Sequence, residues 1–191
     1  MAYYVRKIVR AKWKLIDDGA KNVIGNYKAD TVANDMRTQA NTLSLWRVES
    51  LEEKDVIPAV VINSLLGDTI SDIDLIFIPE EMMTNFTLKQ TDGNTVVINY
   101  RDCHRDVVGL TVKSHILFAN NVVLKILALE NRRKSCDVIT EPGPLIRKYR
   151  ERALLPLINE WIDNNEIEFD QLKEKQRDAI LQWRAKNGRA C

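Results

Sequence analysis

The hydrophobic pattern along the chain alternates between segments of period two and segments with helix-like spacing. Residues 3–13 alternate apolar and basic side chains, residues 42–48 alternate as well, and residues 73–79 form a continuous apolar run. Alternation is typical of a half-buried strand, and a short apolar run is typical of a buried one. We predict strands over these three ranges and a hairpin near residues 86–99, with its turn at residues 91–94 (TDGN).

A first helix is predicted after the second strand. Residues 56–65 place Val, Ile and Leu at helical intervals, and the S-x-x-E pattern that starts at Ser50 is typical of a capping box. Pro58 leaves two starts open, because proline is unfavourable beyond the first helical turn. The helix begins either at Leu51, with a kink at the proline, or after Asp55 as its N-cap.

The longest apolar stretch with helix-like spacing extends from about residue 105 to 130, and we predict a long buried helix there. Two amphipathic helices are expected at about residues 145–164 and 171–187. These elements predict an α+β (or α/β) fold, in which a small mixed β-sheet packs on the long buried helix and a C-terminal helical pair follows. The proline- and glycine-containing segment before residue 145 suggests a core domain over residues 1–140 and a helical extension over residues 141–191.

Charge is distributed unevenly, although the net charge is only +1. Residues 1–47 carry +5, residues 48–84 carry −8, residues 85–131 carry +1 and residues 132–191 carry +3. Opposed patches favour contact with another protein or with a second copy of the chain, whereas a dedicated nucleic-acid binder is basic overall. The candidate partner-binding residues are Glu52, Glu53, Asp68, Glu80 and Glu81 on the acidic side and Arg132, Arg133, Arg147 and Arg150 on the basic side.

The most specific motif is the D-x-D pair within residues 62–81 (INSLLGDTISDIDLIFIPEE). Asp72 and Asp74 share one side of a strand, where two carboxylates can hold Mg²⁺. With the upstream Ser64-x-x-Gly67, this segment resembles the catalytic strand of minimal nucleotidyltransferases. The resemblance implies catalytic and metal-binding roles for both aspartates, with Ser64 at a helix start. The alternative is a polar lead-in to a buried strand, with Asp72 as a cap.

A second polar cluster occupies residues 101–106 (RDCHRD). His104, together with Asp102 or Asp106, is a candidate catalytic general base. The alternative is the first turn of a helix, where carboxylates are favoured by the helix dipole. His115 would lie about 16 Å away on the same helix, so the two histidines would not share a metal ion.

The second predicted strand offers a third possibility. Asn41, Ser44, Trp46 and Arg47 can line a nucleotide pocket, because tryptophan stacks on a base and arginine pairs with phosphate. A tryptophan in a strand is also an ordinary core residue.

The three cysteines show no paired spacing, and neither a signal peptide nor a bilayer-spanning apolar stretch is apparent. We therefore expect a cytoplasmic protein without membrane contact. The first hypothesis is a non-enzymatic protein-binding module that needs no cofactor, such as an antitoxin, an immunity protein or an accessory subunit of a bacterial or phage system. The alternatives are a Mg²⁺-dependent nucleotidyltransferase-like enzyme that uses Asp72 and Asp74, and a nucleic-acid-binding protein that uses the basic N-terminal strand and residues 147–152.

Overall fold

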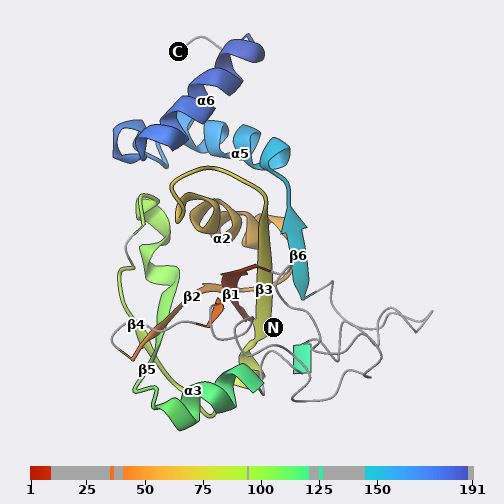
Figure 1. Cartoon of the computed structure of the whole chain (residues 1–191), viewed down its shortest axis with the longest axis vertical. Helices are drawn as coiled ribbons and strands as arrows, with labels where there is room; N and C mark the ends of the chain where they lie inside the picture. Colours follow the sequence, from red (N-terminus) through yellow and green to blue (C-terminus); the bar gives the residue numbers. More distant parts are fainter. Residues whose placement is uncertain (10–34, 37–40, 94, 121–124, 127–144, 189–191) are drawn as a thin grey trace, which may run out of the picture.

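In the computed structural model, the chain forms one β-sheet with helices on both faces (Figure 1). The structure describes residues 1–9, 35–36, 41–93, 95–120, 125–126 and 145–188. The strands are β1 (Tyr3–Ile8), β2 (Leu43–Val48), β3 (Ile73–Pro79), β4 (Thr87–Gln90), β5 (His104–Val108) and β6 (Ile146–Tyr149). The helices are α2 (Glu53–Leu65), α3 (Val112–Phe118), α5 (Glu151–Asp163) and α6 (Glu174–Lys186), with short 3-10 helices η2 (Glu80–Met83), η3 (Ile98–Cys103) and η5 (Phe169–Gln171).

The six strands lie in the order β4-β5-β2-β1-β3-β6, and every neighbouring pair is antiparallel rather than mixed. β3 pairs with β1 along six residues, from Tyr3 opposite Pro79 to Ile8 opposite Asp74. Every residue of β3 except Asp74 is buried. The apolar run therefore forms the strand that its sequence predicts, with the same bounds.

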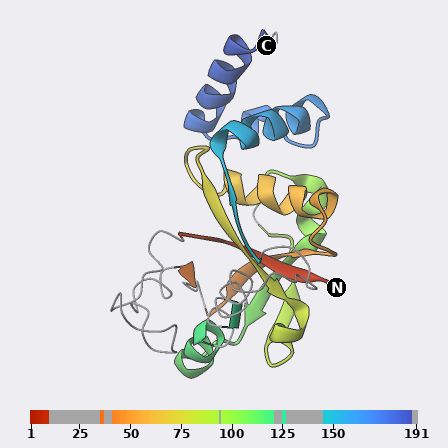
Figure 2. The ribbon, with the colours of Figure 1, turned by 90° about the vertical axis from the view of Figure 1, so that its right-hand side faces the viewer.

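One face of the sheet is covered by α2, and the two C-terminal helices lie beyond α2 on the same side (Figures 1 and 2). α5 packs on α2 with its buried residues, which include Leu154 and Ile158. The side-chain amide of Gln176 in α6 donates to the carbonyl oxygens of Leu65 and Gly67, at 3.0 and 2.8 Å. These bonds satisfy carbonyl groups at the C-terminal end of α2, where a helix has no internal donors left.

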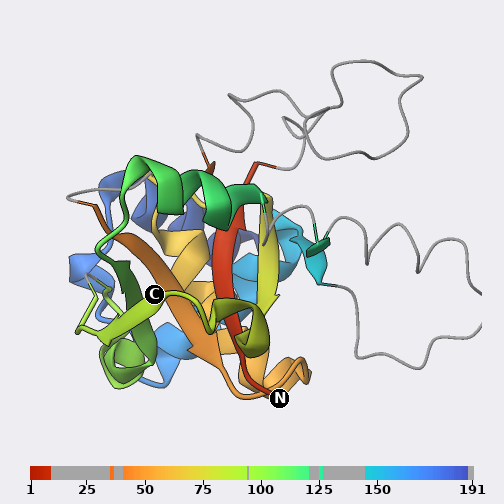
Figure 3. The same cartoon turned by 90° about the horizontal axis from the view of Figure 1, so that it is seen from below.

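The opposite face of the sheet is crossed by α3 (Figure 3). Phe118, which is fully buried, contacts the ring of Phe86 edge-on, with the ring centroids 5.0 Å apart. The imidazole Nε2 of His115 lies at hydrogen-bond distance, 2.5 Å, from the carbonyl oxygen of Met36. These two contacts, one apolar and one polar, help to hold helix α3 against the sheet.

The α+β class and the C-terminal helical pair are confirmed, but the long buried helix predicted over residues 105–130 is wrong in its start and its burial. Helix α3 (Val112–Phe118) lies within this range, and of its residues only Phe118 is buried. Residues 104–108 form strand β5, which pairs with β2 on one side and β4 on the other. Strand neighbours on both sides satisfy its backbone groups, so the tertiary pairing overrides the helix-like spacing. The buried helix that packs on the sheet is α2. Residues 121–124 and 127–130 lie outside the part of the chain that the structure describes.

Three further boundaries differ from the expectations. The hairpin near residues 86–99 is replaced by a pairing of β4 with β5, and residues 146–149 form strand β6 before α5 begins. Helix α2 starts at Glu53 with Pro58 in its second turn, and its N-cap makes no side-chain bond. The division of the chain at residue 140 stays a prediction.

Candidate functional site

The two aspartates of the D-x-D motif lie at the start of β3, and Asp72 lies beside two cations. The backbone N–H of Glu151 donates to Asp72 Oδ1 at 2.9 Å, and Lys148 Nζ lies 3.1 Å from Asp72 Oδ2. Arg150 Nη1 is 3.8 Å from the same oxygen. The hydrogen bond from the Glu151 backbone, together with Lys148, lowers the pKa of Asp72. Asp72 therefore connects β3 to the N-terminus of α5, which is the capping role that the alternative interpretation expected.

Asp74 and Ser64, the other two residues of the nucleotidyltransferase resemblance, do not lie beside Asp72 in one site. Asp74 lies within β3, where the strand register sets it opposite Ile8 of β1 and Lys148 of β6. Ser64 is fully buried in the last turn of α2, where its hydroxyl donates to the carbonyl oxygen of Val61 at 2.6 Å, so it is not at a helix start. Among the described residues, no group of three or more His, Cys, Asp or Glu side chains is placed to hold a metal ion. The Mg²⁺ hypothesis stays a prediction.

Most of the candidate partner-binding acids form ion pairs within the chain. Asp68 pairs with Lys173 at 2.8 Å, Glu52 with Lys54 at 3.1 Å, and Glu80 with Arg47 at 3.6 Å. Glu53 and Glu81 are exposed and form no ion pair with a described residue. Much of the acidic charge of residues 48–84 thus neutralises basic side chains of the same fold.

The basic candidates are also engaged where the structure describes them. The guanidinium of Arg147 lies over the ring of Phe77, 5.0 Å from its centroid, and donates to the carbonyl oxygen of Leu51 at 3.1 Å. Arg150 faces Asp72, as given above. Arg132 and Arg133 lie outside the described residues.

An apolar surface that the sequence analysis did not single out lies on α3. Val112, Ile116 and Leu117 are 80%, 54% and 47% exposed, whereas Phe118 of the same helix is fully buried. Val112 and Ile116 are one helical turn apart, so they lie next to each other on the helix surface. We call these three residues the α3 patch.

His104 is the most buried of the three predicted catalytic residues. It is 5% exposed, and its ring contacts Trp46 edge-on with a centroid distance of 4.8 Å. Its Nδ1 lies 2.6 Å from Thr91 Oγ1, and the Thr91 hydroxyl donates to Asp106 Oδ2 at 2.9 Å. The other Asp106 oxygen accepts from the Ser44 hydroxyl at 2.8 Å. Of the two predicted partners, the structure brings Asp106 into the His104 network, and Asp102 is exposed.

This network fixes the tautomer of His104. A hydroxyl has a single proton, and that of Thr91 is given to Asp106, so the Nδ1–H of His104 must donate to Thr91 Oγ1. Burial, which outweighs the opposing charge of Asp106, lowers the pKa of His104. The ring is therefore neutral near pH 7, and Nε2 carries the lone pair. It lies 3.9 Å from Asp106 Oδ1.

A pocket of about 360 Å³, which we call the polar pocket, opens beside this network. Strand pairing sets Ser44 opposite Asp106 and Trp46 opposite His104, and it sets Val5 opposite Trp46. Lys7 follows Val5 by two positions, so all of these side chains share the face covered by α2. The lining includes Leu66, which follows α2, and the polar side chains of Arg6, Lys7, Asp35, Ser44, Trp46, Asn63 and His104.

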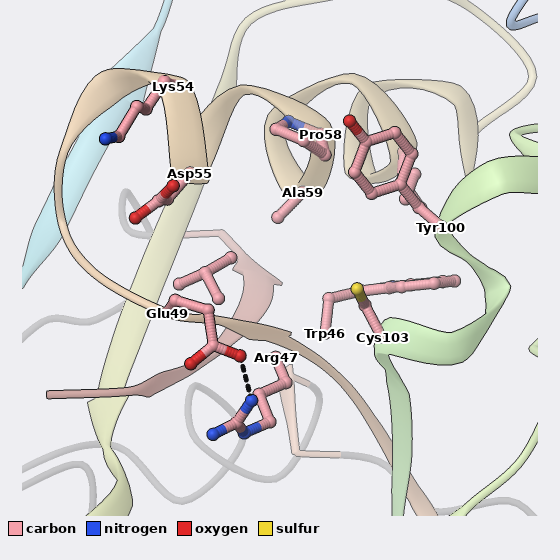
Figure 4. Close-up of a pocket in the computed structure, with 11 residues that line it drawn as sticks. Trp46, Arg47, Glu49, Lys54, Asp55, Pro58, Ala59, Tyr100 and Cys103 are labelled. Carbon is pink, nitrogen blue, oxygen red and sulfur yellow. Dashed lines mark hydrogen bonds and ion pairs between the residues drawn. The ribbon is translucent and has the colours of Figure 1, made fainter.

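A second pocket of about 210 Å³ lies on the other side of Trp46, between α2 and η3 (Figure 4). Its walls are largely apolar and include Pro58, Ala59 and Tyr100, and the Arg47–Glu49 ion pair lies at one side. Burial raises the pKa of the Cys103 thiol in this wall, so Cys103 remains protonated near pH 7. This pocket therefore offers an apolar surface rather than a nucleophile.

Comparison of the chain with models of known protein families, with curated proteins and with solved structures gives no match. Within the described residues, no helix has the length and apolar character needed to cross a bilayer. Ser44 and Trp46 do border a pocket, as the nucleotide interpretation expected, but Arg47 lines the second one. Lys7 and Thr91 were missed, because only the pairing of distant strands brings them near His104.

Proposed function

We propose that the protein is a non-enzymatic module that binds another protein through the α3 patch. The observation that supports this proposal is the exposure of Val112, Ile116 and Leu117 on one short helix, next to the buried Phe118. Fully burying one such side chain stabilises by about 1.5–3 kcal/mol. Leaving three of them in solvent therefore favours an interface that covers them.

The charge around the α3 patch indicates what kind of partner fits. Residues 107–129 contain no aspartate or glutamate, but they do contain Lys113 and Lys125, both of which are exposed. A complementary surface has apolar side chains at its centre and carboxylates at its rim. The partner that we propose is thus an acidic and apolar protein surface, such as one face of an amphipathic acidic helix.

The partner proposed here is acidic, whereas the acidic residues 48–84 suggested a basic partner. A basic partner for residues 48–84 requires unpaired acids, and Asp68, Asp72 and Glu80 already face cations of this chain. The nucleic-acid alternative relies partly on Arg147 and Arg150, which make contacts within the chain. Its N-terminal Arg6 donates to the carbonyl oxygens of Asp35 and Ser44. The cytoplasmic location and the antitoxin, immunity or accessory role stay predictions.

The test is binding to a purified partner. A partner captured from source cells is identified, purified and titrated against the wild type, Ile116→Glu and the control Leu181→Glu, which alters an exposed apolar residue of α6. We expect Ile116→Glu to weaken binding at least tenfold and Leu181→Glu to leave it unchanged. Equal affinities for all three proteins contradict the proposal.

Two other occupants of the α3 patch are distinguished by the same variants. If the wild type self-associates in sedimentation velocity and Ile116→Glu does not, the patch is an interface between copies. If the wild type binds anionic vesicles and Ile116→Glu does not, the patch contacts a lipid surface. Either result overturns the proposal of a separate protein partner.

A further inference from the structure

We propose that the polar pocket is a binding site for a small hydroxylated or aminated oxyanion, a carboxylate or a phosphate, with Lys7 as its counter-ion. The proposal is independent of the α3 patch, which lies across the sheet on α3. It goes beyond protein binding, because it gives this chain a small-molecule ligand. A volume of about 360 Å³ falls within the range of known ligand sites.

Lys7 supplies the charge. It is partly buried in the pocket wall, and its ammonium group forms no ion pair or hydrogen bond with a described residue. The other charged side chains of the wall, Arg6 and Asp35, do have bonds: Arg6 donates to the Asp35 carbonyl oxygen, and Asp35 accepts the backbone N–H of Val9. Burying a charge without a partner is costly, so an anion bound at Lys7 removes a penalty that the empty fold retains.

Trp46 supplies a second donor. The residue is 4% exposed, yet its indole N–H has no acceptor in the described part of the chain. Buried polar groups are nearly always hydrogen-bonded, so an exception calls for an explanation, such as a partner that is not part of the chain. Trp46 lines the polar pocket, so an oxyanion near Lys7 can accept from both groups.

His104, which lines the pocket, supplies an acceptor. Its bond to Thr91 leaves the lone pair on Nε2, to which an N–H or O–H group of the ligand can donate. The ligand class that fits the lining is therefore an oxyanion that also carries an amino or hydroxyl group.

The experiment follows the indole N–H signal of Trp46 by NMR, assigned with Trp46→Phe, at constant ionic strength. The probes are lactate for the carboxylate arm and glycerol 3-phosphate for the phosphate arm, with chloride as the reference anion. We expect a saturable shift with at least one of the two probes, and the probe that binds more tightly identifies the oxyanion. No saturable shift with either probe overturns the proposal.

The matched variants are Lys7→Met and Lys186→Met, of which the second removes an exposed lysine from α6. We expect Lys7→Met to weaken the saturable shift at least tenfold while its melting temperature stays equal to that of the wild type or rises, because an unpaired buried charge is removed. Lys186→Met is expected to bind as the wild type does. Equal affinity in all three proteins overturns the role of Lys7, and a large fall in the melting temperature of Lys7→Met assigns Lys7 to the fold instead.

Discussion

Asp72 accepts a hydrogen bond from the backbone N–H of Glu151 at 2.9 Å, across 79 positions of the sequence. This single bond connects the start of β3 to the first turn of α5. Lys148 and Arg150, which precede that helix, approach the same carboxylate. Asp72, the first residue of the D-x-D motif, thus makes a structural contact that holds the start of α5 beside the sheet.

The Asp72 contact predicts a stability effect that depends on pH. Its pKa is lowered in the folded protein, so its contribution is present above the ordinary carboxyl pKa and is lost as the pH falls through the folded value. We expect Asp72→Asn to unfold at lower denaturant concentration than the wild type at pH 7, with the difference shrinking towards pH 3. The control is Glu81→Gln. A Mg²⁺-dependent stabilisation that Asp72→Asn removes would instead favour the metal interpretation.

Gly93 predicts a strong effect of a single methyl group. Its φ is +60°, and a Cβ there would lie 2.8 Å from Cγ of His104. We expect Gly93→Ala to lower the free energy of unfolding by about 2–4 kcal/mol, since the backbone strain of about 1–2 kcal/mol adds to the collision with the ring. Gly109→Ala is the control, because Gly109 has φ +68° with no atom within 4 Å. Equal losses of unfolding free energy in the two variants would show that the His104 ring moves aside without destabilising the fold.

His104 predicts a loss of stability on mild acidification. Burial lowers its pKa in the folded state, so the unfolded chain takes up a proton first as the pH falls through the ordinary value of about 6.5. We expect the free energy of unfolding to decrease between pH 7.5 and 5.5, by at most about 1.4 kcal/mol per pH unit. Chemical denaturation at several pH values measures this slope. His104→Gln should remove this part of the slope, and an unchanged slope would place its origin elsewhere.

We predict that Arg147 contributes to the stability of the fold rather than to partner binding. Its contact with the Phe77 ring and its bond to Leu51 together contribute about 1–3 kcal/mol. We expect Arg147→Ala to lower the free energy of unfolding by this amount. Arg152→Ala, at an exposed position in the first turn of α5, should change it by less than about 0.5 kcal/mol. Equal effects would contradict the assignment.

The parts of the fold that could be predicted are those whose sequence signal is local. The apolar run of β3 is buried on both faces, and its burial marks its bounds in the sequence. β5 (HRDVV) and β6 (IRKY) are short and rich in charge, so they resemble helix starts. Their strand conformation comes from pairing with β2, β4 and β3, which no local pattern contains.

The candidate sites follow the same division. The chemical type of His104 and Asp106 is visible in the sequence, but their link through Thr91 depends on the pairing of β4 with β5. The position of Lys7 beside them depends on the strand order of the whole sheet. The ion pairs of Asp68 and Asp72 are equally non-local. The sequence therefore suggests that the acidic side chains of residues 48–84 are free to contact a partner, whereas in the structure several of them pair with cations of the same chain.

Amide hydrogen exchange of the protein with and without its purified partner tests the central claim most directly. The proposal predicts that binding slows exchange over Val112–Phe118, the helix that carries the α3 patch, in the wild type and in Leu181→Glu but not in Ile116→Glu. Protection confined to residues 48–84, with α3 exchanging as in the free protein, would contradict it and return the acidic segment to the role that the sequence first suggested.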